Sequence, residues 1–261
     1  MLKKWFGVGK AIAPVPRDVA LEDRIYAIGD VHGRVDLLNG MLKRIALDIA
    51  AQEDDREPRI ILLGDLIDRG DQSREVLDLV MDVRADLPDG RLQILSGNHE
   101  AALLAFLKDP GGRSEWLRFG GLQTLTSYGV QPPKTNASAA EYNAVADQLR
   151  AAMGNHLDFL TTFERFIVSG DVVFVHAGLA PNLALEKQDD AAILWGNSGF
   201  LDAGGVADWR VVHGHYDAAD PVTNPKRICV DTGAYYSGRL TAVRLDAGET
   251  MITVDVMDAL G

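Results

Sequence analysis

The chain has little cysteine, no strongly basic segment and no long apolar run, and each absence excludes a class of protein. Cys229 is the single cysteine among 261 residues, so no intrachain disulfide can form, and this fits a reducing, cytoplasmic compartment. No stretch approaches the roughly 20 apolar residues that cross a membrane. The formal charge is −12, and without a lysine or arginine cluster the composition argues against nucleic acid as the principal partner.

The first residues carry charged and aromatic side chains but no long apolar segment, which argues against a cleaved secretory signal. We expect residues 1–20 to form a flexible lead-in and residues 21–261 to form one domain. In an alternative interpretation, Trp5 and Phe6, which follow two lysines, dock on a partner or a membrane surface.

Short apolar runs that stop at glycine or a polar residue favour buried strands. The first three such runs are residues 24–29, 59–64 and 92–96. Between and after them, apolar residues recur at steps of three and four, which is typical of amphipathic helices. We expect these helices at residues 35–49, 71–86 and 100–108. Strands and helices that alternate in this way form parallel β-α-β units, so the predicted fold class is α/β.

Glycine and proline break residues 109–165 into short helical pieces, and no second core is evident there. We therefore expect a helical insertion within the domain. The strand pattern then returns at residues 166–168, 171–175, 209–212 and 227–230. Residues 240–245 and 251–256 predict a terminal antiparallel hairpin.

Side chains that bind metals follow these predicted strands closely. They are Asp30, His32, Asp65, Asn98, His176 and His215. Ligands in an open α/β sheet bind outside the carboxyl ends of the strands, so these side chains can converge on one rim. Carboxylate, amide and imidazole together suit a pair of divalent ions such as Mn²⁺, Fe²⁺ or Zn²⁺. Two ions roughly 3.5–4 Å apart support in-line attack on phosphorus, so the sequence predicts a two-metal phosphoester hydrolase.

Each motif alone carries modest weight, because a lone aspartate after a strand is more often a cap or turn residue. Their joint occurrence is more informative. Five of the six histidines fall inside these short segments: His32, His99, His176, His213 and His215. The sixth, His156, lies in the predicted insertion, where we expect a surface role.

The ordered motifs resemble those of a known family. They are Gly-Asp-x-His-Gly at 29–33, Gly-Asp-x-x-Asp-Arg-Gly at 64–70, Gly-Asn-His-Glu at 97–100, His-Ala-Gly at 176–178 and Gly-His at 214–215. This set resembles the metallophosphoesterases, specifically the bacterial and phage branch of the phosphoprotein phosphatases, and Phe119-Gly120-Gly121 also resembles bacterial members. The resemblance implies the calcineurin-like metallophosphoesterase fold, with two mixed β-sheets in a sandwich flanked by helices.

The resemblance also implies a ligand set for two divalent ions per chain, for which Mn²⁺ is favoured and Zn²⁺ and Fe²⁺ are alternatives. The first ion would take Asp30, His32 and Asp65, and the second Asp65, Asn98, His176 and His215. Asp65 would then bridge the ions, and a water between them would have its pKa lowered from about 16 towards 7. The resulting hydroxide would attack phosphorus directly, in line.

His99 follows the ligand Asn98, and adjacent residues in an extended segment point apart, so we interpret His99 as a general acid rather than a ligand. Such catalysis typically contributes about 10²–10⁴-fold. Asp68 would hold its imidazole, and Arg69 would bind the phosphate together with Asn98 and His99. The competing interpretations are that Asp68 caps the next helix and that Arg69 forms a surface ion pair.

Two further residues are candidates for supporting the site. His213 and His215 are two apart on a predicted strand and should face the same way, so His213 either supports the metal ligands or packs in the core. Asp231 would support the site through hydrogen bonds. Relatives often carry a phosphate-binding arginine after a Leu-Trp pair, but none follows Leu194-Trp195 here. That second contact is missing or comes from elsewhere, with Asn197, Arg210 and Arg239 as candidates.

The leading hypothesis is a metal-dependent phosphomonoesterase, a protein serine/threonine phosphatase acting on phosphoproteins or phosphopeptides. The first alternative is a symmetrical dinucleoside tetraphosphate hydrolase, which has the same core motifs. The second is a non-catalytic phosphate- or metal-binding protein, against which the intact His99 and Asp68 pair argues. A two-metal nuclease fits the acidic composition poorly.

Overall fold

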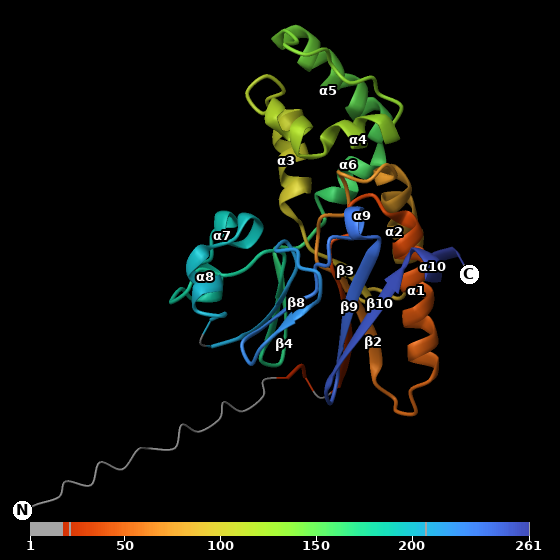
Figure 1. The fold of residues 1–261 in the computed structure, drawn as a ribbon, viewed down its shortest axis with the longest axis vertical. Coiled ribbons are helices and arrows are strands. Elements are labelled where there is room, and N and C mark those ends of the chain that lie inside the picture. The colour runs from red at the N-terminus through yellow and green to blue at the C-terminus, as the bar shows by residue number, and fades with distance from the viewer. Residues whose placement is uncertain (1–17, 21, 207, 261) are drawn as a thin grey trace, which may run out of the picture.

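The computed structural model describes residues 18–20, 22–206 and 208–260 (Figure 1). Most of the predicted lead-in, including Trp5 and Phe6, lies outside these residues. Within the described ranges, every helix is too short or too polar to cross a membrane.

The first sheet has five strands in the order β10-β9-β1-β2-β3. Its strands are β1 (Asp23–Ile28), β2 (Glu57–Leu62), β3 (Leu92–Ile94), β9 (Arg239–Leu245) and β10 (Glu249–Asp255). The first three are parallel, and β9 and β10 form the predicted antiparallel hairpin at the free edge of β1. The crossovers are α1 (Val35–Ala50) and α2 (Ser73–Asp86), so the helices predicted at residues 35–49 and 71–86 are confirmed.

The second sheet has five strands in the order β4-β5-β6-β8-β7. Its strands are β4 (Phe166–Ser169), β5 (Val172–Val175), β6 (Arg210–His213), β7 (Val222–Thr223) and β8 (Arg227–Cys229). β5, β6 and β8 run parallel, whereas β4 and β7 are antiparallel to their neighbours. Both sheets are therefore mixed, as expected.

The two sheets pack face to face through an apolar layer. Ile25 and Ala27 of β1 bury their side chains there with Phe174 and Val212 of the second sheet. Because side chains alternate along a strand, Tyr26 on the other face of β1 packs in the core formed with the helices. The predicted α/β sandwich is confirmed.

Short helices join α3 (Asn98–Lys108) to β4 and stand at one end of the molecule (Figure 1). They are the 3-10 helix η1 (Ser114–Phe119), α4 (Gly121–Ser127), α5 (Ala139–Met153) and α6 (Asn155–Leu160). Their apolar side chains, among them Trp116, Leu125 and Leu149, join the same core cluster as α1 and α2. This segment therefore packs directly on the elements that carry the rim of the first sheet.

The outer face of the second sheet is covered by a third apolar cluster that includes Ile193 and Phe200. These residues come from α7 (Asp190–Trp195) and α8 (Ser198–Asp202), which lie beside that sheet in Figure 1. The remaining short elements are the 3-10 helix η2 (Leu185–Lys187), α9 (Ala234–Ser237) and α10 (Val256–Leu260).

Candidate functional site

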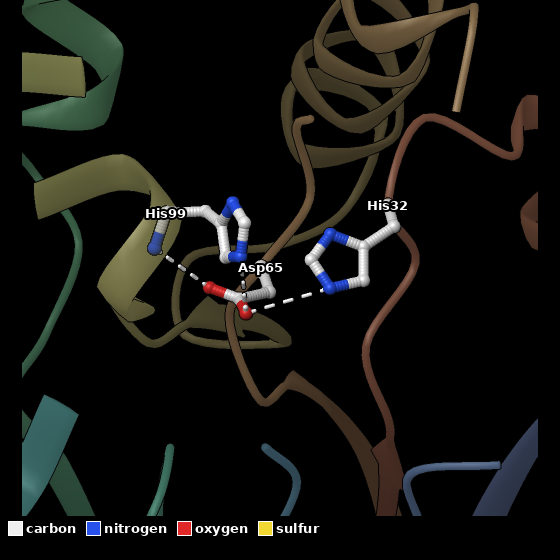
Figure 2. A group of neighbouring side chains, drawn as sticks. All are labelled: His32, Asp65 and His99. Carbon is white, nitrogen blue, oxygen red and sulfur yellow. Dashed lines mark hydrogen bonds and ion pairs between the residues drawn. The ribbon is translucent and has the colours of Figure 1, made fainter. Parts of the chain in front are cut away.

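Asp65 lies at the centre of the polar residues that follow the parallel strands. Its Oδ2 atom is 3.6 Å from Nε2 of His32, 3.5 Å from Nε2 of His176 and 3.9 Å from Nε2 of His99. Figure 2 shows the His32 and His99 rings on either side of this carboxylate. These three histidines are buried, so the carboxylate is enclosed by nitrogen donors.

Among the described residues, two groups of side chains offer atoms within 4.8 Å of one another, and both contain Asp65. The first group is His32, Asp65 and His99, and the second is Asp65, His176 and His215. Asn98 adds an amide oxygen to the second group, because its Oδ1 is 2.9 Å from His176 Nε2 and 2.9 Å from His215 Nδ1. A ligand that bridges two metal ions must belong to both donor groups, and the Asp65 carboxylate does.

Backbone carbonyls orient two of the imidazoles. His32 Nδ1 lies 2.9 Å from the carbonyl oxygen of Ile67, and His176 Nδ1 lies 2.8 Å from that of Leu63. A ring N–H that donates to a carbonyl leaves the opposite nitrogen free as a metal donor. The Nε2 atoms of both rings face Asp65.

The charge states of these groups suit divalent ions. Burial lowers the pKa of His32 to about 3 and that of His215 to about 4, and neutral imidazole is the form that binds metals. Burial opposes the ionisation of Asp65, but positive charge on the surrounding histidines when they are protonated, His176 first, and the backbone N–H of His99 lower its pKa below the ordinary range. Carboxylate, amide and neutral imidazole form a donor set that fits Mn²⁺, Fe²⁺ or Zn²⁺.

Asp30 reaches the same rim but lies outside both donor groups. Its carboxylate accepts the backbone N–H of His215 at 3.3 and 3.2 Å. Burial, followed by the nearby carboxylates of Asp231 and Asp65, raises the pKa of Asp30 well above its ordinary value. In the first donor group, the third side chain beside His32 and Asp65 is therefore His99 and not Asp30, which we had expected.

His99 and Asn98 lie on the first turn of α3, so the expectation of an extended segment was wrong. The backbone N–H of His99 donates to Asp65 Oδ1 at 3.0 Å, and its Nδ1 lies 2.8 Å from Asp68 Oδ2. Burial would lower the pKa of His99, but the carboxylates of Asp65 and Asp68 raise it above the ordinary value. A histidine held in its protonated form can donate a proton.

Asp68 is fully buried and does not cap α2. Besides the His99 contact, its Oδ2 accepts the indole N–H of Trp116 at 2.7 Å, and its Oδ1 accepts the hydroxyl of Thr124 at 2.6 Å. Sequence reasoning missed both donors. They come from the helical segment after α3, and no local pattern in the chain indicates that this segment contacts Asp68.

Glu100 was also missed as a positioning residue. Its carboxylate accepts the backbone N–H groups of Asp65, Leu66 and Gly97 at 3.0, 2.8 and 2.9 Å. One carboxylate thus holds the turn after β2 against the start of α3. A glutamate three residues into a helix can accept the backbone N–H of the residue that starts it, as the glutamate of a capping box does, and this spacing could have indicated its role.

The backbone at the site is strained. Seven non-glycine residues of the described chain have positive φ, and five of them belong to the predicted motifs. These five are His32, Asp65, Asp68, Arg69 and His215. Such conformations are uncommon outside glycine and persist where surrounding contacts enforce them, often at functional sites.

Arg69 is oriented into the site rather than to a surface carboxylate. Its Nη1 lies 3.1 Å from His32 Nε2, and its guanidinium lies 5.1 Å from the centre of the Tyr235 ring. Gly120 accepts the Arg69 backbone N–H at 3.2 Å and has φ 120°. A Cβ on Gly120 would lie 2.5 Å from that nitrogen, so glycine is required for the contact.

His213 and His215 do not face the same way, because the chain leaves β6 at His213 and His215 has φ 65°. His213 Nε2 lies 3.1 Å from Arg227 Nη1, and its ring packs edge-on against Phe200. Burial lowers the pKa of His213 to about 3. Asp231 accepts the backbone N–H of Gly233 at 2.9 Å. Its negative charge contributes to the raised pKa of Asp30.

The structure also shows the contacts of three further residues from the sequence analysis: Arg210, Arg239 and His156. Arg210 forms an ion pair with Glu249, and Arg239 pairs with Asp220 at 3.2 Å, so neither guanidinium is free for a phosphate. The surface role expected for His156 was wrong. That residue is only 5% exposed, and its Nδ1 lies 2.6 Å from the Tyr128 hydroxyl.

A two-sheet α/β sandwich with these donors gathered at one rim is the arrangement of a metal-dependent phosphoesterase. Residues 23–246 match the family model described as calcineurin-like phosphoesterase, and the chain belongs to this family. The resemblance to metallophosphoesterases and the predicted fold are therefore confirmed, and members of this family act with divalent metal ions.

The chain is 24% identical to the bis(5'-nucleosyl)-tetraphosphatase PrpE (asymmetrical) of Oceanobacillus iheyensis, over 87% of this chain and 90% of the relative. It is 24% identical to a symmetrical bis(5'-nucleosyl)-tetraphosphatase of Xanthomonas oryzae pv. oryzae, over 87% of this chain and 83% of the relative. Among solved structures, a protein provisionally described as a diadenosine tetraphosphatase matches with a TM-score of 0.59 at 19% identity, covering 92% of this chain and 98% of that one.

Proposed function

We propose that this phosphoesterase hydrolyses dinucleoside tetraphosphates. The observation that carries the proposal is the match to relatives named bis(5'-nucleosyl)-tetraphosphatases over more than four fifths of this chain and of their own length. Our first alternative from the sequence was the symmetrical form of this activity. The leading hypothesis, a protein serine/threonine phosphatase, has weaker support, because a yeast phosphatase of that type matches with a TM-score of 0.50 at 16% identity, a likeness of fold alone.

The proposed metal ligands are those expected from the motifs. Asp65 would serve both ions because it is common to both donor groups, with His32 on one side and His176 and His215 on the other. Asn98 completes the second set through its amide oxygen, and Asp30 stays the proposed third ligand of the first. When bound, the ions supply Lewis acidity and lower the pKa of a coordinated water.

The remaining residues of the site bind the phosphate and protonate the leaving group. The guanidinium of Arg69 binds the phosphate oxygens, with the side chains of Asn98 and His99 nearby. His99, held by Asp68, donates a proton to the leaving group. His213 and Asp231 would support the site from outside the donor groups.

The buried His99 and Asp68 pair favours a second candidate function. A nucleotide that leaves a dinucleoside tetraphosphate is a weak base and needs little protonation. The alkoxide of serine or threonine is a strong base and needs a proton as it departs. A well-held proton donor is therefore the feature expected of a phosphomonoesterase that accepts phosphopeptides.

Side-by-side turnover of diadenosine tetraphosphate and a phosphothreonine peptide, with the metal-loaded protein, tests the proposal. We expect kcat/KM to be higher for the dinucleotide by about tenfold or more, which is a preference of about 1.4 kcal/mol. Chromatography of the products distinguishes symmetrical cleavage to two ADP from asymmetrical cleavage to ATP and AMP. A tenfold preference for the peptide would reject the first candidate and support the second.

A further inference from the structure

A cavity of about 400 Å³ opens beside Arg69. It lies between that residue, the end of η1 and the start of α4, and its lining includes Arg118, Phe119, Gln123 and Tyr235. Arg69 itself lines the cavity, so the cavity borders the proposed phosphate site.

The cavity is positively charged in an acidic protein. Of the residues that the structure describes, two arginines and no carboxylate line it, although the whole chain has a formal charge of −12. Nearby Arg113 pairs with Glu115, whereas Arg69 and Arg118 form no salt bridge with any described residue. Two guanidinium groups without a carboxylate partner in one cavity favour an anionic ligand with more than one charged group.

The same cavity presents aromatic rings to solvent. Phe119 is 57% exposed and Tyr235 is 38% exposed, although large apolar side chains in this fold are mostly buried. The Tyr235 ring also contacts the Arg69 guanidinium and packs edge-on against His32, with ring centres 5.5 Å apart. Exposed rings beside cations are the surface on which nucleobases stack.

We infer that this cavity binds the nucleotide that departs from the dinucleoside substrate. Arg118 contacts the phosphates beyond the one held by Arg69, and Phe119 and Tyr235 receive the nucleobase. This assignment rests on the proposed function and specifies how its substrate is recognised. Arg118 then supplies the second phosphate contact that the sequence lacks after Leu194-Trp195, from a different part of the chain.

Steady-state kinetics of Arg118→Ala test the role of the side chain. The ratio of kcat/KM for diadenosine tetraphosphate to that for p-nitrophenyl phosphate should fall about tenfold, because only the dinucleotide reaches Arg118. Arg118→Lys should recover part of the loss. Arg44→Ala is the matched control, since Arg44 is an exposed arginine on α1 that lines a different cavity. An unchanged ratio in Arg118→Ala would overturn the inference.

Calorimetric binding of ADP separates this inference from the proposed function. Arg118→Ala should weaken ADP binding about tenfold, and Phe119→Ala should weaken it to a smaller extent. If the wild-type protein cleaves no dinucleotide, the proposed function fails, yet the same loss of ADP affinity would still support a nucleotide site. Unchanged ADP affinity would overturn the inference, as would a loss confined to phosphopeptide turnover.

Discussion

The indole N–H of Trp116 donates to the same oxygen of Asp68 that holds His99, at 2.7 Å and 2.8 Å respectively. Thr124 donates to the other oxygen of Asp68 at 2.6 Å. Both donors lie in the short helices after α3, so that segment fixes the carboxylate that orients the proposed general acid. The helices therefore contribute to the chemistry of the site as well as to its walls.

Trp116→Phe should impair proton donation while keeping most of the ring's packing. Removing one hydrogen bond to a charged group typically costs about 1.5–3 kcal/mol. Because Asp68 then holds His99 less firmly, we expect part of this energy to raise the barrier to proton donation. We expect a loss of about tenfold in kcat on phenyl phosphate, whose phenolate leaving group has a conjugate-acid pKa near 10. On p-nitrophenyl phosphate, whose leaving group is a weaker base, the loss should be several times smaller.

Two variants calibrate this measurement. His99→Ala sets the upper limit and should cost about 10²–10⁴-fold on phenyl phosphate. Trp209→Phe is the matched control, because Trp209 packs on the far face of the second sheet and should leave both rates unchanged. Equal losses of Trp116→Phe on the two substrates would show that the indole only supports the fold.

Local patterns predicted the residues that follow strands and missed those held by distant contacts. Asp65 and Asn98 could be placed because a buried apolar run before each ends at glycine, which is a short-range signal. Trp116 is 48 positions from Asp68 in the chain, and Thr124 is 56 positions away. Only the packing of the inserted helices creates these contacts, so no periodicity in the sequence encodes them.

Strand alternation failed at His215 for a related reason. The rule that residues two apart share a face holds while the chain stays extended, but β6 ends at His213 and the next residues turn. The error over His156 also came from tertiary contacts, since Tyr128 and Asp78 bind its two ring nitrogens. The direction of a side chain beyond the end of a strand and the burial of a polar residue inside a helical segment are thus the least predictable from sequence.

Gly120→Ala should disturb Arg69 without a direct change to any polar group. A methyl group there would lie 2.5 Å from the Arg69 nitrogen, so the η1 turn and the guanidinium must separate. We expect KM for p-nitrophenyl phosphate and the inhibition constant for inorganic phosphate to rise about three- to tenfold, since a charge-assisted contact weakens.

Gly129→Ala controls for the backbone cost of that change. Gly129 also has positive φ, at 73°, but a Cβ there would meet nothing within 4 Å. Both variants should lose about 1 kcal/mol of stability from the unfavourable backbone conformation. If Gly129→Ala raised the phosphate inhibition constant as much as Gly120→Ala, the contact with Arg69 would not be the cause.

Removal of metal should lower both activity and stability, and Asp65→Asn should abolish the response to metal. A ligand at 100 times its Kd stabilises the folded state by about 2.7 kcal/mol, which is several degrees in Tm. We expect Mn²⁺ added to chelator-treated protein to raise Tm and restore turnover, with Zn²⁺, Fe²⁺ and Mg²⁺ compared in the same assay. Asp82→Asn, an exposed aspartate on α2, is the control and should respond like the wild type. A Tm increase in Asp65→Asn equal to that of the wild type would contradict the shared-ligand assignment.

Cys229 offers an independent probe of the same metal site. Its thiol is only 1% exposed, and burial raises its pKa to about 12, so the native protein should react only slowly with a thiol-specific disulfide reagent at pH 8. One equivalent should react after unfolding in guanidinium.

The Cys229 Sγ lies 3.3 Å from the carbonyl oxygen of Tyr216, next to the proposed ligand His215. Metal binding at His215 stabilises this turn and should slow the reaction in the wild type, with no such protection in Asp65→Asn. Rapid labelling of the native protein, or labelling that Mn²⁺ does not slow, would separate Cys229 from the metal site.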